Sequence, residues 1–225
     1  MTDCTFNRSS VTAVDVVDGV LWITNSQFQG TFGGVGGTSS SVRVENCDFS
    51  SVVGVGVSNS VANILDSRFV DTAAVSASEG IVVLRNLEIR GGLGLVSSFA
   101  SVLVSNCLIA GAPLNNGIHF SDGRLIVENS TIIDNLGPGI DIGSGTLEVV
   151  LRNSILWGNF PDFRGTTEIG QLRFNENDGI VITIENSIIE GWTGKLGGTG
   201  NSGLDPMFID RIGPDGIPRT GDGDY

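Results

Sequence analysis

A short phrase recurs nine times along this chain and constrains its fold more than any other feature. The phrase consists of alternating apolar residues, then Asn or Asp, a small residue, any residue, and a large apolar residue; clear copies read VRVENCDF, VLVSNCLI and ITIENSII. The Asn or Asp recurs every 20 to 24 residues, with a last interval of 33, at Asp3, Asn25, Asn46, Asp66, Asn86, Asn106, Asn129, Asn153 and Asn186. A fixed period of this length is typical of a solenoid, in which each repeat forms one coil.

The apolar residues of each repeat alternate with period two, which indicates β-strands. Equivalent positions are chemically uniform, and the third residue after the Asn or Asp is always large and apolar: Phe6, Phe28, Phe49, Phe69, Ile89, Ile109, Ile132, Leu156 and Ile189. Such uniformity is expected if equivalent residues stack inside the coils about 4.8 Å apart. Asn and Asp tolerate the left-handed backbone of a corner, and a column of amides can hydrogen-bond along the axis.

A third strand precedes these two in several repeats, for example at residues 53–57, 73–77 and 139–142. The leucine spacing of a leucine-rich repeat is absent, and an antiparallel sandwich would not keep identical residues in register along the whole chain. The sequence therefore predicts an all-β fold, a right-handed parallel β-helix of about nine coils with three short strands each. Cys4, Cys47 and Cys107 fall in the inward column of small residues, which predicts buried free thiols rather than a disulfide.

Composition restricts the partners of this chain. With 12 basic and 25 acidic residues, the net charge is −13. The chain has one lysine, Lys195, and its arginines are isolated from one another in the sequence. Such a surface repels nucleic acid and anionic lipid, so we expect neither a nucleic-acid partner nor membrane insertion. No apolar run approaches the roughly 20 residues that span a bilayer, and no secretory signal is visible, which indicates a mature fragment or an excised domain.

The repeat phrase resembles that of parallel β-helix repeat proteins of the pectate-lyase-like superfamily, over roughly residues 3–190. The stretches NSILWGN (153–159) and GNSGLDPMFID (200–210) are similar to the C-terminal end of bacterial secreted or surface-anchored β-helix proteins. The resemblance implies a secreted or cell-surface location, with the β-helix at residues 1–190. Residues 191–225 are then a C-terminal cap and side-packing tail, which we expect to cover an outward apolar stripe of Val83, Leu103, Ile126 and Val150.

In β-helix polysaccharide enzymes the substrate lies along the first sheet, and the resemblance places a candidate site there. The outward positions predicted for this sheet are Asp15, Gly36, Gly56, Ser76, Gly94, His119, Asp141 and Asp162. His119 and Asp141 should be neighbours on adjacent coils, with Asp162 next, and these three are the candidate catalytic residues. Asn116, Asp134 and Asn135 lie on the adjacent turns and are candidate substrate-binding residues.

Two functions remain open at this point. Paired carboxylates suit a glycoside hydrolase, and His119 can act as acid or base near neutral pH, so a polysaccharide lyase or hydrolase is one reading. Against it, no Arg or Lys is expected in the His119 column, and the sugar-stacking aromatic residues of known enzymes are missing from it. The other hypothesis, which we favour, is a non-catalytic β-helix module that acts as a rigid scaffold for adhesion or for contact with a polysaccharide or cell-surface glycan.

Calcium is the one cofactor that the sequence suggests. Asp210, Asp215, Asp222 and Asp224 lie in an acidic, glycine-rich C-terminal stretch that resembles loops binding calcium through hard oxygen ligands. The alternative is a solvated acidic tail.

Overall fold

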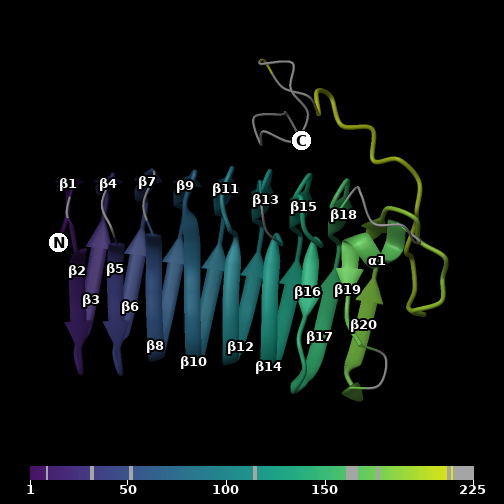
Figure 1. The fold of residues 1–225 in the computed structure, drawn as a ribbon, viewed down its shortest axis with the longest axis horizontal. Helices are drawn as coiled ribbons and strands as arrows, with labels where there is room; N and C mark the ends of the chain where they lie inside the picture. The colour runs from purple at the N-terminus through teal and green to yellow at the C-terminus, as the bar shows by residue number, and fades with distance from the viewer. Residues whose placement is uncertain are drawn as a thin grey trace.

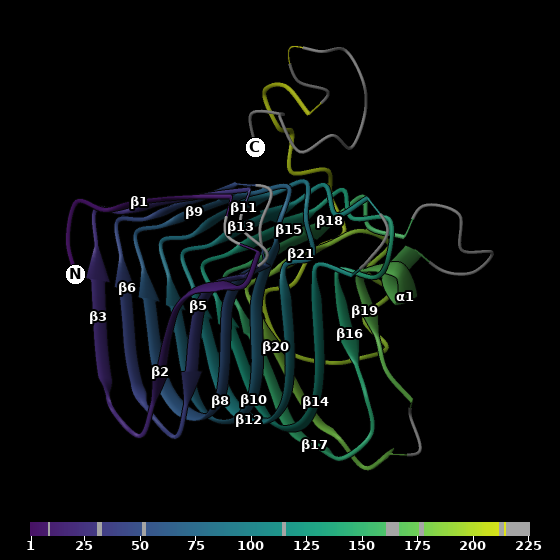
Figure 2. The ribbon, with the colours of Figure 1, turned by 60° about the vertical axis from the view of Figure 1, so that its left-hand side comes forward.

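The computed structural model describes residues 1–8, 10–30, 33–50, 53–113, 116–160, 167–175, 178–211 and 214. The chain winds into an all-β parallel β-solenoid, which confirms the predicted fold class, and it makes about seven turns. Figures 1 and 2 show the coils stacked in sequence order along one axis, so that residues one repeat apart lie side by side.

One strand from each repeat belongs to a sheet of nine short parallel strands. Each of these strands begins two residues after the corner residue of its repeat. Phe28, Phe49 and Phe69 pair directly across neighbouring strands of this sheet. In sheet order the strands are β1 (Thr5–Asn7), β4 (Gln27–Gln29), β7 (Asp48–Ser50), β9 (Arg68–Val70), β11 (Glu88–Arg90), β13 (Leu108–Ala110), β15 (Thr131–Ile133), β18 (Ile155–Trp157) and β21 (Ile188–Ile189).

The other two strands of each coil belong to a second sheet of twelve strands. Its longest strands run through a bend without leaving the ladder, at Asn59, Glu79, Phe99 and Asp122, whose φ angles are 48° to 61°. One path through the sheet comprises β2 (Thr12–Val17), β5 (Gly33–Thr38), β8 (Val53–Leu65), β10 (Ala73–Arg85), β12 (Leu95–Ser105), β14 (Ile118–Glu128), β16 (Ile140–Ile142) and β19 (Leu172–Arg173). The strands β3 (Val20–Thr24), β6 (Ser41–Glu45), β17 (Thr146–Arg152) and β20 (Val181–Glu185) complete it.

All nine predicted corner residues adopt the left-handed backbone conformation, with φ between 49° and 54°. Their side chains hydrogen-bond along the axis in three places: Asn46 donates to Asn25 at 2.7 Å, Asn86 to Asp66 at 2.7 Å, and Asn106 to Asn86 at 3.3 Å. Asn and Asp are the residues that reach this conformation with the least steric cost after glycine. The prediction that these residues form a corner column is confirmed.

The core is a pile of equivalent side chains running along the axis. The rings of Phe6, Phe28, Phe49 and Phe69 stack face to face, with centroids 4.5 to 4.7 Å apart. The pile continues through buried isoleucines at the same position of the later coils. The three cysteines are free, as the repeat predicts, and Cys47 and Cys107 are buried beside this column. The prediction of a buried thiol is wrong for Cys4, which is only partly buried.

The last coil differs from the others. It contains a short helix, α1 (Thr167–Gln171), and residues 199 and 202 form parallel bridges to Glu185 and Ile188. Trp192 and Leu196 pack against the end of the core. Further along, Leu204, Met207 and Ile209 are largely exposed, and Arg211 contacts Asp134 at the end of β15. This described part of the tail therefore reaches the side of the nine-stranded sheet. Of the apolar stripe, Val83, Leu103 and Ile126 line a hollow on the twelve-stranded sheet, and Val150 is buried. That residues 191–225 cover this stripe stays a prediction.

Candidate functional site

The outward column of the first strands is fixed by the strand register. Asp15, Gly36, Gly56 and Ser76 occupy it as predicted, and His119 pairs with Asp141 on the next strand. The predicted adjacency of His119 and Asp141 is therefore confirmed. At two other positions of the column the strand register differs from the prediction.

Val96, not Gly94, stands between Ser76 and His119 in the register. Gly94 is buried, and a Cβ on it would lie 2.1 Å from the backbone oxygen of Gly117. It is thus an interior position where one coil approaches the next, which explains the glycine. Val96 lies ten residues before the corner Asn106, as Ser76 lies ten before Asn86.

Arg173, not Asp162, follows Asp141 in the column. Residues 161–166, and Asp162 with them, lie outside the described residues. The insertion that contains α1 lengthens this coil, so the strand that pairs with β16 starts at Leu172. The expectation that the column holds no basic residue is therefore wrong.

Three side chains contact the carboxylate of Asp141. Arg173 donates from Nε to Oδ1 at 2.7 Å and from Nη2 to Oδ2 at 2.8 Å. The Nδ1 atom of His119 lies 3.0 Å from Oδ2, and Asn116 donates to the same oxygen at 2.9 Å. The bidentate pair with Arg173 fixes the carboxylate plane, and charge-assisted bonds of this kind are about twice as strong as neutral ones.

The protonation state of Asp141 follows from these contacts. Partial burial on its own raises the pKa of Asp141, but the hydrogen bonds and positive charge of Arg173, followed by those of His119, outweigh it and hold the pKa below its usual value. The same contact raises the pKa of Arg173. Asp141 is therefore an ionised acceptor at neutral pH.

His119 and Arg173 remain partly open to solvent, with 42% of each side chain exposed, whereas 12% of the Asp141 side chain is exposed. The guanidinium of Arg173 lies 5.8 Å from the ring centre of Phe160, within cation–π range. The cluster thus presents a histidine, a guanidinium and an aromatic ring at one end of the column. Gly36 and Gly56 lie toward the other end of the column.

The predicted substrate-binding residues separate into two groups. Asn116 joins the cluster through its bond to Asp141. Asp134 and Asn135 are buried, with 1% and 0% of their surfaces exposed. Asp134 accepts from Nε of Arg211 at 3.0 Å, and it is ion-paired with Nη2 of the same guanidinium. Asp134 and Asn135 were predicted to bind substrate, but neither side chain is exposed to a ligand.

Asn135 belongs instead to a buried polar ladder that sequence reasoning missed. Its side chain donates to Asn159 at 2.8 Å, and Asn159 donates to Gln171 at 2.6 Å. Asn159 and Asn135 also satisfy backbone groups of the neighbouring coils. The spacing of 24 residues between the two asparagines, equal to that of the adjacent corners, was the available signal.

The described residues contain no group of three or more His, Cys, Asp or Glu side chains that could hold a metal ion. Of the proposed calcium ligands, Asp210 is described, and Asp215, Asp222 and Asp224 lie outside the described residues. Calcium binding stays a prediction. Within the same described segments, no helix has the length and apolar character needed to cross a bilayer.

Neither family models nor curated proteins offer a match to this chain. The resemblance to the pectate-lyase-like superfamily consequently stands on the repeat phrase, while the parallel β-solenoid stands on the structure.

The depressed pKa of Asp141 predicts a pH-dependent contribution to stability. A carboxylate whose folded pKa is lowered stabilises the fold above its unfolded pKa of about 3.9, and this stabilisation disappears as the pH falls through the folded value. We expect Asp141→Asn to be less stable than the parent at pH 7, with the gap narrowing below about pH 4.

Urea unfolding at pH 7, 5 and 3 measures that gap. Asp15→Asn, which changes an exposed carboxylate in the same column, should show little difference from the parent at any of these pH values. A gap for Asp141→Asn that stays constant from pH 7 to pH 3 contradicts the ionic role of Asp141.

Proposed function

We propose that this chain is a non-catalytic β-solenoid module of a secreted or cell-surface protein, a rigid scaffold that contacts glycans. The contact surface we assign is the outward column that ends in His119, Asp141 and Arg173. In this proposal the fold keeps these side chains in fixed places, and carbohydrate binding rather than bond cleavage is the activity.

The observation that carries the proposal is the saturation of the Asp141 carboxylate. Its two oxygens accept two bonds from Arg173, one from Asn116 and one contact from His119. A catalytic acid needs a proton near neutral pH, and a nucleophile or base needs an accessible lone pair. With a depressed pKa and paired oxygens, Asp141 is suited to orienting Arg173 and His119 instead.

The spacing of carboxylates along the column also favours binding. Hydrolases place two carboxyl groups roughly 5 to 9.5 Å apart. Among the described members of the column, Asp15 and Asp141 carry carboxylates, and five strands separate β2 from β16. At the usual strand spacing this corresponds to about 29 Å.

The exposed groups of the cluster match an anionic sugar. Arg173 offers guanidinium hydrogens to a carboxylate or sulfate, and Phe160 offers a ring face for stacking against a sugar ring. Gly36 and Gly56 have no side chains that project from the outer surface of the sheet, and a Cβ on Gly56 would touch nothing within 4 Å. An extended chain can therefore lie along the strands' outer surface.

A polysaccharide lyase or glycoside hydrolase remains the second candidate, and one contact favours it. If Asp141 accepts the Nδ1 proton of His119, the basic nitrogen is Nε2, an arrangement that enzymes use to orient a general base. In that mechanism His119 would remove a proton from the sugar, and Arg173 would neutralise an adjacent carboxylate.

Turnover assays separate the two candidates. We expect no release of reducing ends and no unsaturated product from polygalacturonate, alginate, xylan or β-glucan, with the parent and Asp141→Asn equally inactive. Oligogalacturonate should nevertheless bind the parent, and Arg173→Gln should weaken that binding by about tenfold, as loss of a charge-assisted contact predicts. Turnover by the parent that disappears in both Asp141→Asn and His119→Ala would establish the enzyme instead.

A further inference from the structure

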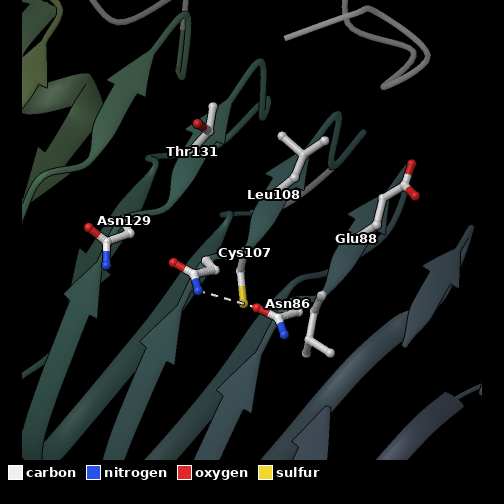
Figure 3. A pocket seen from close by; sticks show the side chains of 8 residues that line it. Asn86, Glu88, Cys107, Leu108, Asn129 and Thr131 are labelled. Atoms are coloured by element: carbon white, nitrogen blue, oxygen red, sulfur yellow. Dashed lines mark hydrogen bonds between the residues drawn. The ribbon is translucent and has the colours of Figure 1, made fainter. Parts of the chain in front are cut away.

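A hollow of about 440 Å³ lies at the corner between the two sheets, remote in sequence from Arg173. Figure 3 shows two rows of its side chains, with the corner residues Asn86 and Asn129 on one side and the outward residues Glu88, Leu108 and Thr131 on the other. The corner residue Asn106 also lines the hollow. Each row takes one residue from each of three successive coils, because Glu88, Leu108 and Thr131 pair across β11, β13 and β15.

The side-chain hydrogen bonds of the corner column end at this hollow: among the described corner residues, no step from Asn106 onwards forms, and the step from Asn46 to Asp66 is also missing. Asn106 donates to Asn86 at 3.3 Å, the bond drawn in Figure 3. The next step does not form: within the described part of the chain, Oδ1 of Asn106 and the side-chain amide of Asn129 have no hydrogen-bond partner. The backbone ladder continues unbroken here, since the Asn106 nitrogen donates to the Glu128 oxygen at 3.1 Å.

A third polar group faces the same space. Among the described residues the hydroxyl of Thr131 also lacks a protein partner. The hollow thus brings together an unpaired carbonyl oxygen, an unpaired amide and an unpaired hydroxyl on two adjacent coils. A ligand hydroxyl is chemically complementary to the first two, because it can donate to Oδ1 of Asn106 and accept from the amide of Asn129.

The charge and surface of the hollow narrow the class of ligand. Glu88 is its one charged lining residue, and ion pairs with Arg68 and Arg90 compensate that charge. Burial raises the pKa of the Cys107 thiol to about 11, so the thiol adds no charge to the hollow at neutral pH. Leu108 and Leu87 add apolar surface. Hydroxyl-binding groups beside apolar carbon suit a sugar ring, which has both polar edges and C–H faces.

We infer that this hollow binds the hydroxyl groups of an uncharged sugar residue, through Asn106, Asn129 and Thr131. The inference rests on the proposed glycan-contacting function and adds a second surface to it. A glycan with neutral and acidic residues could then contact the module at two places with different chemistry.

Residue-resolved NMR of the whole 15N-labelled chain tests the site, with cellohexaose, xylohexaose and mannohexaose as the probes. We expect at least one of them to shift backbone amides at residues 106–108 and 129–131. Thr131→Val and Asn129→Asp should each weaken that binding by about three- to tenfold, the usual effect of one lost hydrogen bond. Asp66 occupies the same corner column at a φ of 49°, so the Asp substitution is compatible with the fold.

Asn153→Asp is the matched control, because it adds the same charge at the next corner, where φ is also 49°, outside the lining of the hollow. It should bind the probes as the parent does, and so should Arg173→Gln. If none of the three sugars shifts residues 106–108 or 129–131 at millimolar concentration, the neutral-sugar site is wrong. Binding of oligogalacturonate that depends on Arg173 would in that case still support the proposed function, and loss of both kinds of binding would reject both.

Discussion

Phe49→Ala is expected to destabilise the fold by about 3–5 kcal/mol, the usual effect of emptying a buried aromatic position. Phe49 is 1% exposed and stacks on Phe28 and Phe69 with centroid distances of 4.5 and 4.6 Å. Its removal leaves a cavity between two rings that the strand ladder holds in place. Because 1 kcal/mol corresponds to roughly 2–4 °C for a chain of this size, Tm should fall by about 10 °C.

Phe99→Ala is the comparison for this prediction. Phe99 is 65% exposed, so the same truncation there should change the free energy of unfolding by about 0.5 kcal/mol or less. Urea unfolding followed by circular dichroism measures both variants. Equal effects of Phe49→Ala and Phe99→Ala would show that the rings do not form an interior stack.

Gly54→Ala is expected to destabilise the fold although it adds one methyl group. A Cβ on Gly54 would lie 2.3 Å from the backbone oxygen of Ala74 and 2.7 Å from a ring carbon of Phe69. Overpacking of this kind costs about 1–3 kcal/mol, and more where backbone atoms block relaxation. The next coil carries Ala74 at the equivalent position, and there the third residue after the corner is Ile89 instead of a phenylalanine.

Gly56→Ala is a control from the same strand, two residues away. A Cβ there meets nothing within 4 Å, and Gly56 is not among the residues with positive φ. Replacing such a glycine reduces the freedom of the unfolded chain, so this variant should be neutral or more stable by about 0.4–1 kcal/mol. Thermal unfolding compares the pair; a destabilised Gly56→Ala beside a neutral Gly54→Ala would invert the assignment of inside and outside.

The fold was predictable because each coil repeats one local pattern. Corner residues were identified from the Asn or Asp alone, and all nine have the expected positive φ. The phenylalanine pile followed from counting three residues beyond each corner, and the rings stack as that count requires. In both cases the residues that define the pattern also make the contacts, so a count along the chain is sufficient.

The site was less predictable because the strand register depends on which strands hydrogen-bond to each other. Counting residues from a corner does not give those pairings where a coil contains an insertion. His119 and Asp141 were found because their coils have near-average length. Arg173 was missed because an insertion separates it from the preceding corner, whereas counting back from Asn186 would have placed it near the column. The pairing of Arg211 with Asp134 joins residues 77 apart, and no repeat encodes such a contact.

The account depends most on the stacking of successive repeats, and electron paramagnetic resonance between pairs of spin labels measures that stacking directly. Val20, Ser101, Arg124 and Val181 lie in one outward column, with Ser101, Arg124 and Val181 four, five and seven strands from Val20. In a Cys4→Ser background, labels at position 20 and at each of the others should be about 19, 24 and 34 Å apart, rising by about 4.8 Å per coil. Distances that do not grow in proportion to the number of coils would contradict the solenoid, and with it both proposed binding surfaces.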